Sequence, residues 1–479
     1  MIEDFIKIEK KYDLYHLDID GVQPWMYFRF GFWNQQISRK LLELSGNTMG
    51  KEEAQGCIKK LKNFLSCFMD RNARRICKAD IIFCAHQRRI KTNGYFECIY
   101  TDCLLDRYPQ NIVWEDPFQG QHLTPVKAEH IFHTDLSDFV WHGVVKCKRQ
   151  MGKERKIYEQ VKKEFTEPLK EIEAAYHCSI SYSEIYSKLA EIVLEVQARK
   201  IVYNKILDKI APKLIVEVVY YERSHMVLNE VAKARGIPII ELQHGTMHAA
   251  HAAYQFADKC GEIAQFPDYV FIFSDYWKKC AHLPVNDAHI KVTGYPYFER
   301  QIRKYNNSAI KKGEIKNIIF VSQWTISQKL SQLAADLCDL LDAEKYHIIY
   351  KLHPNEYAGW KEKIPVLLRD NIEVIDNRDY GIYEYFSKCS IQVGVYSTAI
   401  YEGLGFHLAT YIYNIGHADT MEELCRQGYA TYVKSAEELY AHITSDEISN
   451  SNHYTENFWK MDSLENICNE IDQLLQDES

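Results

Sequence analysis

The sequence lacks the features of membrane-spanning and secreted proteins. It has no apolar run of about 18 residues or more, the length that crosses a membrane. Its 14 cysteines form no CxxC pair, and the closest two are Cys98 and Cys103. A chain of 479 residues does not need disulfides to fold, so scattered cysteines favour reduced thiols and a cytoplasmic location. The charged stretch MIEDFIKIEKKYDLYHLDID does not resemble a secretory signal peptide.

The sequence also lacks internal repeats, low-complexity tracts and an excess of positive charge. Lys and Arg number 58 and Asp and Glu 66, a formal net charge of −8, which argues against a nucleic-acid partner. Hydrophobic residues make up 46% and charged residues 26%, as in ordinary globular proteins. The length suits two large domains rather than one core.

Short apolar runs alternate with stretches of helical periodicity, which is typical of parallel α/β architecture. In the first part of the chain we expect strands at 79–85, 111–116, 213–221, 237–243, 268–274 and 289–296, and helices at 154–175 and 186–210. After a polar stretch, a second series begins with a strand at 316–323 and a helix at 326–342. Its further strands are expected at 346–354, 371–376, 390–398 and 408–414, before an amphipathic C-terminal helix at 461–477.

This pattern predicts two doubly wound, Rossmann-like domains. The first spans residues 1–300 with helical additions, 301–315 form a linker, 316–460 form the second domain, and 461–479 form the C-terminal helix. Ligands of such sheets bind where the carboxyl ends of the strands meet, so we expect the site in the cleft between the two domains.

The most informative motif is VGVYSTAIYEGLGF, residues 393–406. A strand ends, Ser397 and Thr398 follow, and a helical run begins. A helix N-terminus with two hydroxyls suits a phosphate, and Glu402, one turn further on, suits the two hydroxyls of a ribose. Gly403 and Gly405 would permit close backbone approach. The alternative is an ordinary helix capped by Ser397, which needs no ligand.

The second motif is YKLHPNEYAGW, residues 350–360. Pro354 ends a strand and presents His353 at its carboxyl end, where the imidazole could donate to a phosphate oxygen. Lys351 adds positive charge nearby. The alternative is a plain His-Pro turn.

The third motif is IELQHGTMHAAH, residues 240–251. Its strand reaches a sharp turn at Gly245, which places His244 at the edge of the first sheet, facing the proposed nucleotide site. A histidine there suits a general base. Three histidines at helical spacing could also form a metal site, but Gly245 and Thr246 disfavour a helix that begins at residue 244. We therefore expect no metal and interpret His248 and His251 as structural; a core or loop role for His244 is the alternative.

Further candidates follow two other strands of the first domain. Residues 85–102, AHQRRIKTNGYFECIYTD, carry His86 and Arg88, which suit acceptor binding, and end in Asp102, a further candidate for catalysis. The alternative is an exposed hairpin. Glu222 ends the strand at 213–221 and is a second candidate base.

A basic amphipathic stretch occupies residues 56–78. Such a helix can lie on an anionic membrane surface, and the alternative is a core-packed helix with a solvated face.

These motifs, in this order, resemble those of GT-B glycosyltransferases of bacterial surface-polysaccharide synthesis, from capsule and lipopolysaccharide to teichoic acid. LQHGT and TGYPYFE are similar to elements of CDP-glycerol polymerases, and KLHP and VYSTAIYEGL to nucleotide-phosphate elements of sialyltransferases and capsule Kdo transferases. The resemblance implies that His353, Ser397 and Thr398 bind phosphate, Glu402 the ribose, and His244 serves as base. The sequence departs from the polymerases in two places: their aspartate before Ser397 is missing, and VSQWT (321–325) replaces another of their motifs. Ser322 and Gln323 of VSQWT are also expected to bind the nucleotide.

The resemblance implies an inverting, metal-independent glycosyltransferase without a cofactor. Its donor would be a CMP-, CDP- or UDP-linked sugar, and its acceptor a glycan or lipid-linked glycan, reached in the cytoplasm or at the inner face of the membrane. A nucleotide-sugar 2-epimerase, a polyol-phosphate transferase of the teichoic acid type and a non-catalytic assembly partner remain as alternatives.

Overall fold

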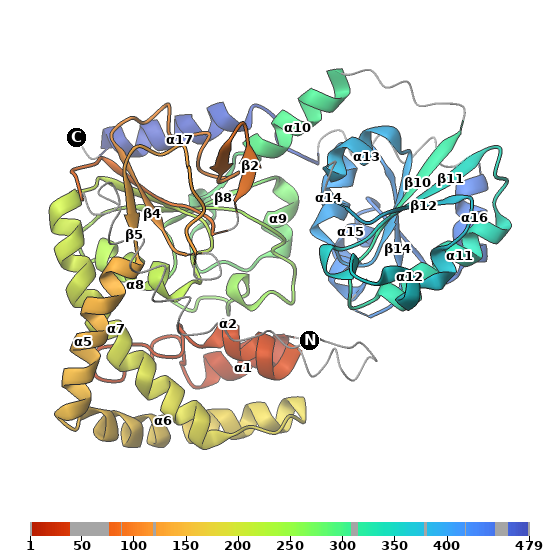
Figure 1. Ribbon diagram of the computed structural model, residues 1–479. Helices are drawn as coiled ribbons and strands as arrows, with labels where there is room; N and C mark the ends of the chain where they lie inside the picture. Colours follow the sequence, from red (N-terminus) through yellow and green to blue (C-terminus); the bar gives the residue numbers. More distant parts are fainter. Residues whose placement is uncertain are drawn as a thin grey trace.

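The computed structural model describes residues 2–38, 76–87, 89–117, 121–307, 315–377, 381–416, 418–445 and 458–477. These residues form two α/β domains, each built on a parallel sheet (Figure 1). This confirms the predicted fold class. The expected basic segment 56–78 lies outside the described residues as far as residue 75.

The sheet of the first domain has the order β5-β4-β1-β6-β7-β8-β9, and every neighbouring pair is parallel. Most side chains of its inner strands are buried, on both faces, because helices cover both sides. Its strands are β1 (Ile81–Cys84), β4 (Asn111–Glu115), β5 (Ile131–His133), β6 (Leu214–Glu217), β7 (Ile239–Leu242), β8 (Tyr269–Ile272) and β9 (Ile290–Val292).

Helices pack around this sheet, and three long helices pack on one another at one side of the domain (Figure 1). They are α5 (Asp135–Gln150), α6 (Lys153–Tyr176) and α7 (Tyr182–Ile210), with α8 (Arg223–Lys233) and α9 (Asp275–Cys280) beside the strands. The N-terminal helices α1 (Glu3–Lys11) and α2 (Arg29–Phe32) are joined by a buried ion pair, in which Arg29 donates to both carboxylate oxygens of Glu9 at 2.7 and 2.9 Å.

The sheet of the second domain has the order β12-β11-β10-β13-β14-β15, again parallel throughout. Its strands are β10 (Lys316–Val321), β11 (Tyr346–Lys351), β12 (Ile372–Ile375), β13 (Ile391–Gly394), β14 (Ala409–Tyr413) and β15 (Thr431–Val433). Its helices include α11 (Ser327–Leu340), α12 (Trp360–Lys363), α13 (Ile382–Lys388), α14 (Thr398–Gly405), α15 (Glu422–Arg426) and α16 (Ala436–Thr444).

Two helices connect the domains. The segment expected as a linker begins as helix α10 (Pro296–Asn307). The predicted C-terminal helix is present as α17 (Ser463–Asp477), and it returns to the first domain rather than staying with the second (Figure 1). Its buried Ile467 and Ile471 belong to the same apolar cluster as Phe83 of β1, and the Tyr108 hydroxyl donates to Asp472 at 2.9 Å.

Each strand expected from the sequence contains an observed strand, and the two long helices of the first domain are present. Residues 85–102 contain a hairpin of β2 (Ile90–Thr92) and β3 (Tyr95–Glu97), but the Arg89 side chain beside it is buried rather than exposed. Strands β5 and β15, each three residues long, were not predicted. No helix among the described residues is long and apolar enough to span a membrane.

Candidate active site

The second sheet has a crevice where its strand order reverses. β10 leads on to β11 on one side, whereas β13 leads on to β14 on the other, so the loops after β10 and β13 diverge. Ligands of doubly wound sheets bind at such a point. Gln323 follows β10, and its side-chain oxygen accepts the backbone N–H of Tyr396, which follows β13, at 3.4 Å. Gln323 thus borders the crevice, in the region where the sequence predicted nucleotide contacts.

Helix α14 begins at this crevice. The Ser397 hydroxyl accepts the backbone N–H of Ala399 at 3.3 Å, so Ser397 is the N-cap that the alternative reading described. Thr398 is the first helical residue, is exposed, and lines a cavity between the domains. The helix therefore presents a hydroxyl and the positive end of its dipole to that cavity.

Glu402 lies one turn further along α14 and lines the same cavity. Its carboxylate accepts one hydrogen bond, from the Tyr383 hydroxyl of α13 at 3.1 Å. Burial raises the pKa of Glu402 to about 7, and the Tyr383 contact offsets only part of that effect. The carboxylate thus has unused acceptor capacity toward the cavity, which a pair of hydroxyls would satisfy.

Gly403 and Gly405 permit close packing within the protein. A Cβ on Gly403 would stand 2.0 Å from Oε1 of the buried Gln392, and one on Gly405 would stand 2.7 Å from the Phe298 ring of α10. The glycines therefore let α14 pack closely on its own sheet and on the helix that joins the domains.

His353 caps the short 3-10 helix Pro354–Glu356 that follows β11. Its Nδ1 accepts the backbone N–H of Asn355 at 3.2 Å, so the ring hydrogen resides on Nε2, the nitrogen that could donate to a phosphate. His353 and Pro354 are not among the residues that line the interdomain cavity. Because β10 separates β11 from β13, His353 lies two strands away from Ser397.

Lys351 and Ser322 have local partners instead of an open path to a ligand. The Lys351 ammonium donates to the Tyr357 hydroxyl and to the Asn377 carbonyl, both at 2.8 Å. The buried Ser322 hydroxyl donates to Glu356 at 3.0 Å. The nucleotide contacts expected of these two residues stay predictions; the Lys351 ammonium keeps a third N–H beyond these two bonds.

His244 follows β7 and lines the interdomain cavity from the first domain, opposite Thr398 and Glu402. Its Nε2 lies 3.0 Å from the Tyr221 hydroxyl, and its backbone carbonyl accepts the Tyr100 hydroxyl at 2.7 Å. Its Nδ1 is buried and has no hydrogen-bond partner. Burial, with a smaller contribution from the charge of His86, lowers the pKa of His244 to about 3, so the ring is neutral near pH 7.

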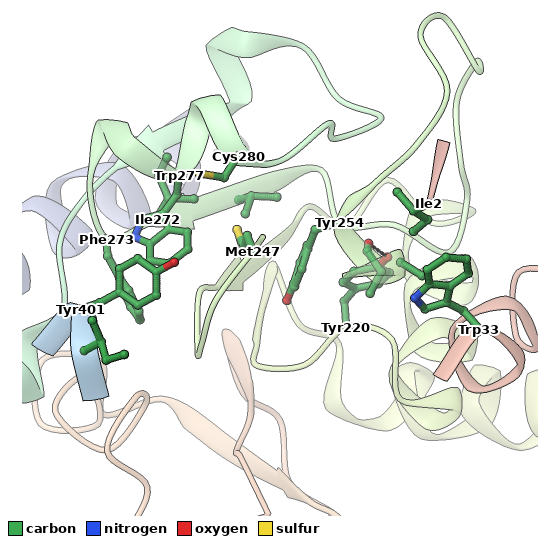
Figure 2. Close-up of a cluster of buried hydrophobic side chains, with 14 of the residues drawn as sticks. Ile2, Trp33, Tyr220, Met247, Tyr254, Ile272, Phe273, Trp277, Cys280 and Tyr401 are labelled. Carbon is green, nitrogen blue, oxygen red and sulfur yellow. Dashed lines mark hydrogen bonds between the residues drawn. The ribbon is translucent and has the colours of Figure 1, made fainter. Parts of the chain in front are cut away.

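The cavity between the domains has a volume of about 460 Å³. Aromatic side chains from both domains form much of its wall, and Figure 2 shows Tyr401 of α14 reaching the side chains of Phe273 and Trp277. The Trp277 and Tyr401 ring centroids are 4.8 Å apart, so direct packing joins the domains at this wall. Its polar or titratable lining comprises His86, Arg89, Tyr100, His244, Thr246, His251, Tyr295, Tyr383, Thr398, Tyr401 and Glu402.

The other predicted residues are His86, Glu222, Asp102 and Arg88, and of the three that the structure describes the first two line a cavity. His86 lines this cavity, and Glu222 lines a second, smaller cavity that also contains His86 and His244. Asp102 is buried against Arg89, 3.4 Å away, and accepts the Cys98 backbone N–H at 3.0 Å; it lines neither cavity, and its position supports a structural role. Arg88 lies outside the described residues.

His248 and His251 lie in the irregular segment that follows His244, before the 3-10 turn Ala252–Tyr254. No helix begins at residue 244, so the three rings do not share one helical face. His248 Nδ1 accepts the backbone N–H of Ala250 at 3.2 Å, as expected of a structural histidine. His251 lines the interdomain cavity, a placement that the sequence did not indicate.

A further polar cluster escaped the sequence analysis because its members are far apart in the chain. Glu115, His122 and His133 offer ligand atoms within 4.8 Å of one another, spacing that could hold a metal ion. However, the His122 and His133 rings stack with centroids 3.7 Å apart at 3°. A bound metal lies near the plane of each imidazole, so one ion cannot serve two stacked parallel rings. The Arg89 guanidinium, 2.5 Å from Glu115, also neutralises this carboxylate.

No protein-family model and no curated protein matches the sequence. Several solved structures are similar in fold. The wall teichoic acid polymerase TagF, soaked with CDPG, is 10% identical with a TM-score of 0.43, over 88% of this chain and 99% of that chain. A UDP-N-acetylglucosamine 2-epimerase is 12% identical with a TM-score of 0.46, over 83% and 96%. S. aureus MnaA with UDP is 13% identical with a TM-score of 0.42, over 59% and 81%.

The architecture itself is defined by the molecule's own topology. Two parallel, doubly wound sheets contribute to one cavity, and the last helix returns to the first domain. This is the GT-B arrangement that the sequence predicted.

Proposed function

We propose that the protein is a glycosyltransferase that uses a nucleotide sugar as donor and a glycan as acceptor. The nucleotide would bind to α14 and the crevice of the second domain, and the acceptor to the first domain. The observation that carries the proposal is the pairing across one cavity of Thr398 and Glu402 on one wall with His244 on the other.

Each side of the cavity suits one part of this reaction. The Glu402 carboxylate, with one hydrogen-bond partner, would accept both ribose hydroxyls. The N-terminus of α14 and the Thr398 hydroxyl would hold the phosphate next to the sugar. His244 would receive the acceptor proton: its ring is neutral near pH 7, and the negative charge of a bound phosphate would raise the pKa that burial lowers.

The transfer would be a single displacement with inversion. The acceptor oxygen forms a bond to the anomeric carbon while its proton passes to His244. The bond from that carbon to the phosphate oxygen breaks, and its electron pair leaves with the nucleotide. The helix dipole and the Thr398 hydroxyl stabilise the charge that develops on the phosphate.

We also propose that the transfer needs no metal, and the composition of the wall supports this. Glu402 is the one carboxylate among the described residues that line the cavity. A magnesium ion at a diphosphate is normally held by one or two carboxylates, and here that single carboxylate is assigned to the ribose.

Calorimetric titration with CMP, CDP, UDP, GDP and dTDP tests the nucleotide site. At least one should bind to the wild type, and Glu402→Ala should weaken its affinity at least about tenfold, the loss of about 1.4 kcal/mol of binding free energy. His353→Ala tests the expected phosphate contact in the same way. Glu437→Gln, a change at an exposed acid of α16, should leave the affinity unchanged. Absence of binding by every nucleotide would overturn the proposal and favour a non-catalytic partner.

Product analysis then separates the alternatives. A glycosidic product formed only with acceptor supports the transferase. Conversion of the nucleotide sugar to an epimer without acceptor would identify an isomerase, and a phosphodiester product would identify a polyol-phosphate transferase.

A further inference from the structure

The first sheet has a crevice of its own at the point where its strand order reverses. β1 leads on to β4 on one side and β6 to β7 on the other, so the loops after β1 and β6 diverge. A cavity of about 330 Å³ lies at this point, lined by residues 85–87 of the first loop and by Val218, Val219, Tyr221 and Glu222 of the second. The first domain therefore has the same topological feature that marks the nucleotide crevice of the second.

This switch-point cavity adjoins the interdomain cavity. His86 and His244 line both, so the two imidazoles form a shared wall between them. A ligand in the switch-point cavity would thus meet His244 from one side while a nucleotide sugar meets it from the other.

The lining of the switch-point cavity suits hydroxyl groups and an apolar ring face. The Phe30 and Tyr221 rings lie with centroids 4.3 Å apart on its wall. Glu222 adds a carboxylate at the start of α8, and Gln87 an amide whose side chain makes no hydrogen bond among the described residues. A few polar groups on a partly aromatic wall is the usual composition of a site that orients a small polar ligand.

The charges of this lining exclude an anionic ligand. It contains neither lysine nor arginine among the described residues. Its one internal cation is His225, whose Nε2 lies 3.4 Å from Asp116 and whose Nδ1 lies 3.1 Å from the Val219 carbonyl. Burial opposes the charge of His225, but the bond to Asp116 outweighs it and raises the pKa of the imidazole to about 9. That charge is balanced by Asp116, and burial raises the pKa of Glu222, so the described lining offers an anion no unpaired positive charge.

The loop after β6 is also strained where it borders the cavity. Val219 has φ +64°, a left-handed conformation that is rare for a β-branched residue. Such strain persists where the surroundings fix the backbone, and it is concentrated at ligand sites. Here the strained residue lies in the loop whose next residues, Tyr221 and Glu222, line the cavity.

We infer that the switch-point cavity binds the uncharged, hydroxyl-bearing end of the acceptor, a neutral sugar or polyol, and presents one of its hydroxyls to His244. The assignment as acceptor site rests on the proposed function, whereas the binding of a neutral sugar does not. Phosphate groups of a larger acceptor stay outside this cavity.

Ligand-observed NMR tests the inference with the full-length protein. The probes are glucose, N-acetylglucosamine, galactose and ribitol at millimolar concentration, each compared with its phosphorylated counterpart. We expect saturation transfer to at least one neutral probe and little or none to the phosphorylated ones. Preference for the phosphorylated probes, or no transfer to any neutral probe, would overturn the inference.

Substitutions at Gln87 locate the binding. Gln87→Trp should fill the cavity and reduce the neutral-sugar signal at least about tenfold without removing a described hydrogen bond, whereas Gln87→Ala, which removes only the amide, should reduce it less. Glu222→Gln, which keeps shape and fold, should weaken the signal, and Glu437→Gln on α16 should not. An unchanged signal in folded Gln87→Trp and in Glu222→Gln would contradict the assignment.

Nucleotide titration of the same variants separates this inference from the proposed function. If the proposed function holds, Gln87→Trp binds nucleotide as the wild type does. If no nucleotide binds to the wild type but neutral sugar is still lost in Gln87→Trp, the sugar site stands and the transferase proposal fails.

Discussion

The Tyr221 hydroxyl lies 3.0 Å from Nε2 of His244, while Nδ1 of the same ring is buried without a hydrogen-bond partner. The two nitrogens therefore have different roles. If the ring hydrogen is on Nε2, it donates to the Tyr221 oxygen, and Nδ1 keeps a lone pair that can accept a proton. In the other tautomer Nδ1 carries the hydrogen and cannot act as a base. The Tyr221 hydroxyl holds the ring in either tautomer, since it can accept from Nε2–H or donate to Nε2; the base role proposed for Nδ1 needs the first arrangement.

Replacement of Tyr221 by Phe removes the hydroxyl that holds the His244 ring in place. We expect kcat for glycosyl transfer to fall about 10–100-fold, because a misoriented base loses a large part of its effect. The affinity for nucleotide should not change, since Tyr221 does not line the interdomain cavity. Tyr440→Phe, at an exposed tyrosine of α16, is the matched control. An equal loss of nucleotide affinity and kcat would indicate a general structural effect instead.

The protonation of His244 should depend on bound nucleotide. In the free protein, burial lowers its pKa to about 3, so the ring should not titrate between pH 5 and 8. Phosphate groups bring negative charge near the ring and favour its protonated form, so we expect nucleotide to raise the pKa. NMR of histidine-labelled protein, with His244→Gln to assign the signal, measures both states. A free-protein pKa near 6.5 would contradict the observed burial.

Local sequence patterns located the residues that follow strands. His244, Thr398 and Glu402 were identified because a strand followed by a turn or a helix fixes where the next side chains lie. For Lys351 and Ser322 the same patterns did not reveal their local partners, Tyr357 and Glu356, and their contact with a nucleotide stays a prediction.

Local sequence patterns could not predict contacts between residues that only the tertiary structure brings together. Tyr221 and His244 lie on different strands' loops, and Tyr383 reaches Glu402 from another helix. The docking of α17 on the first domain likewise depends on a chain path that periodicity does not reveal.

The affinity for a ribonucleotide should depend on pH through Glu402. Burial raises the pKa of Glu402 to about 7, and the ribose hydroxyls bind best to the ionised carboxylate. Below pH 7 a proton must leave first, so Kd should rise about tenfold per pH unit as the pH falls. Titrations at pH 6 and pH 8 with UDP and 2′-deoxy-UDP measure this. We expect a steeper dependence for UDP than for 2′-deoxy-UDP, because the terminal phosphate titrates in both, and loss of this difference in Glu402→Gln; equal pH dependence for both nucleotides would exclude the ribose contact.

Gly403→Ala should destabilise the second domain. The new Cβ would stand 2.0 Å from Oε1 of Gln392, whose side-chain nitrogen donates to the Ile400 carbonyl at 2.7 Å and to the Thr410 hydroxyl at 2.8 Å. The amide cannot move without losing these buried bonds, so we expect a loss of about 2–4 kcal/mol in the free energy of unfolding.

A helical glycine with open space gives the matched control for that change. Gly143, in α5, has no atom within 4 Å of an added Cβ, and Gly143→Ala should raise the free energy of unfolding by about 0.5–1 kcal/mol. Chemical denaturation compares the two variants. A Gly403→Ala protein as stable as the wild type would show that the helix can shift freely.

Glu241 and Glu217 are register partners on β7 and β6, and both are fully buried. Glu241 accepts the Tyr254 hydroxyl at 2.8 Å, but its Oε2 has no hydrogen-bond partner. Burial, and next the charge of Glu217, raise the pKa of Glu241 from 4.5 to about 8. The carboxyl is therefore protonated in the folded protein near neutral pH, whereas the unfolded chain releases the proton.

This difference gives Glu241 a defined effect on stability. Between pH 4.5 and 8 the folded state holds a proton that the unfolded state has lost, so the free energy of unfolding falls as pH rises, by up to about 1.4 kcal/mol per pH unit. Glu241→Gln keeps the shape of the protonated side chain and has nothing to ionise. We expect the variant to gain at least about 1 kcal/mol over the wild type between pH 5 and pH 8. Melting temperatures across this range measure it, with Glu437→Gln as control; wild-type and variant curves that run parallel would show that Glu241 is ionised in the fold.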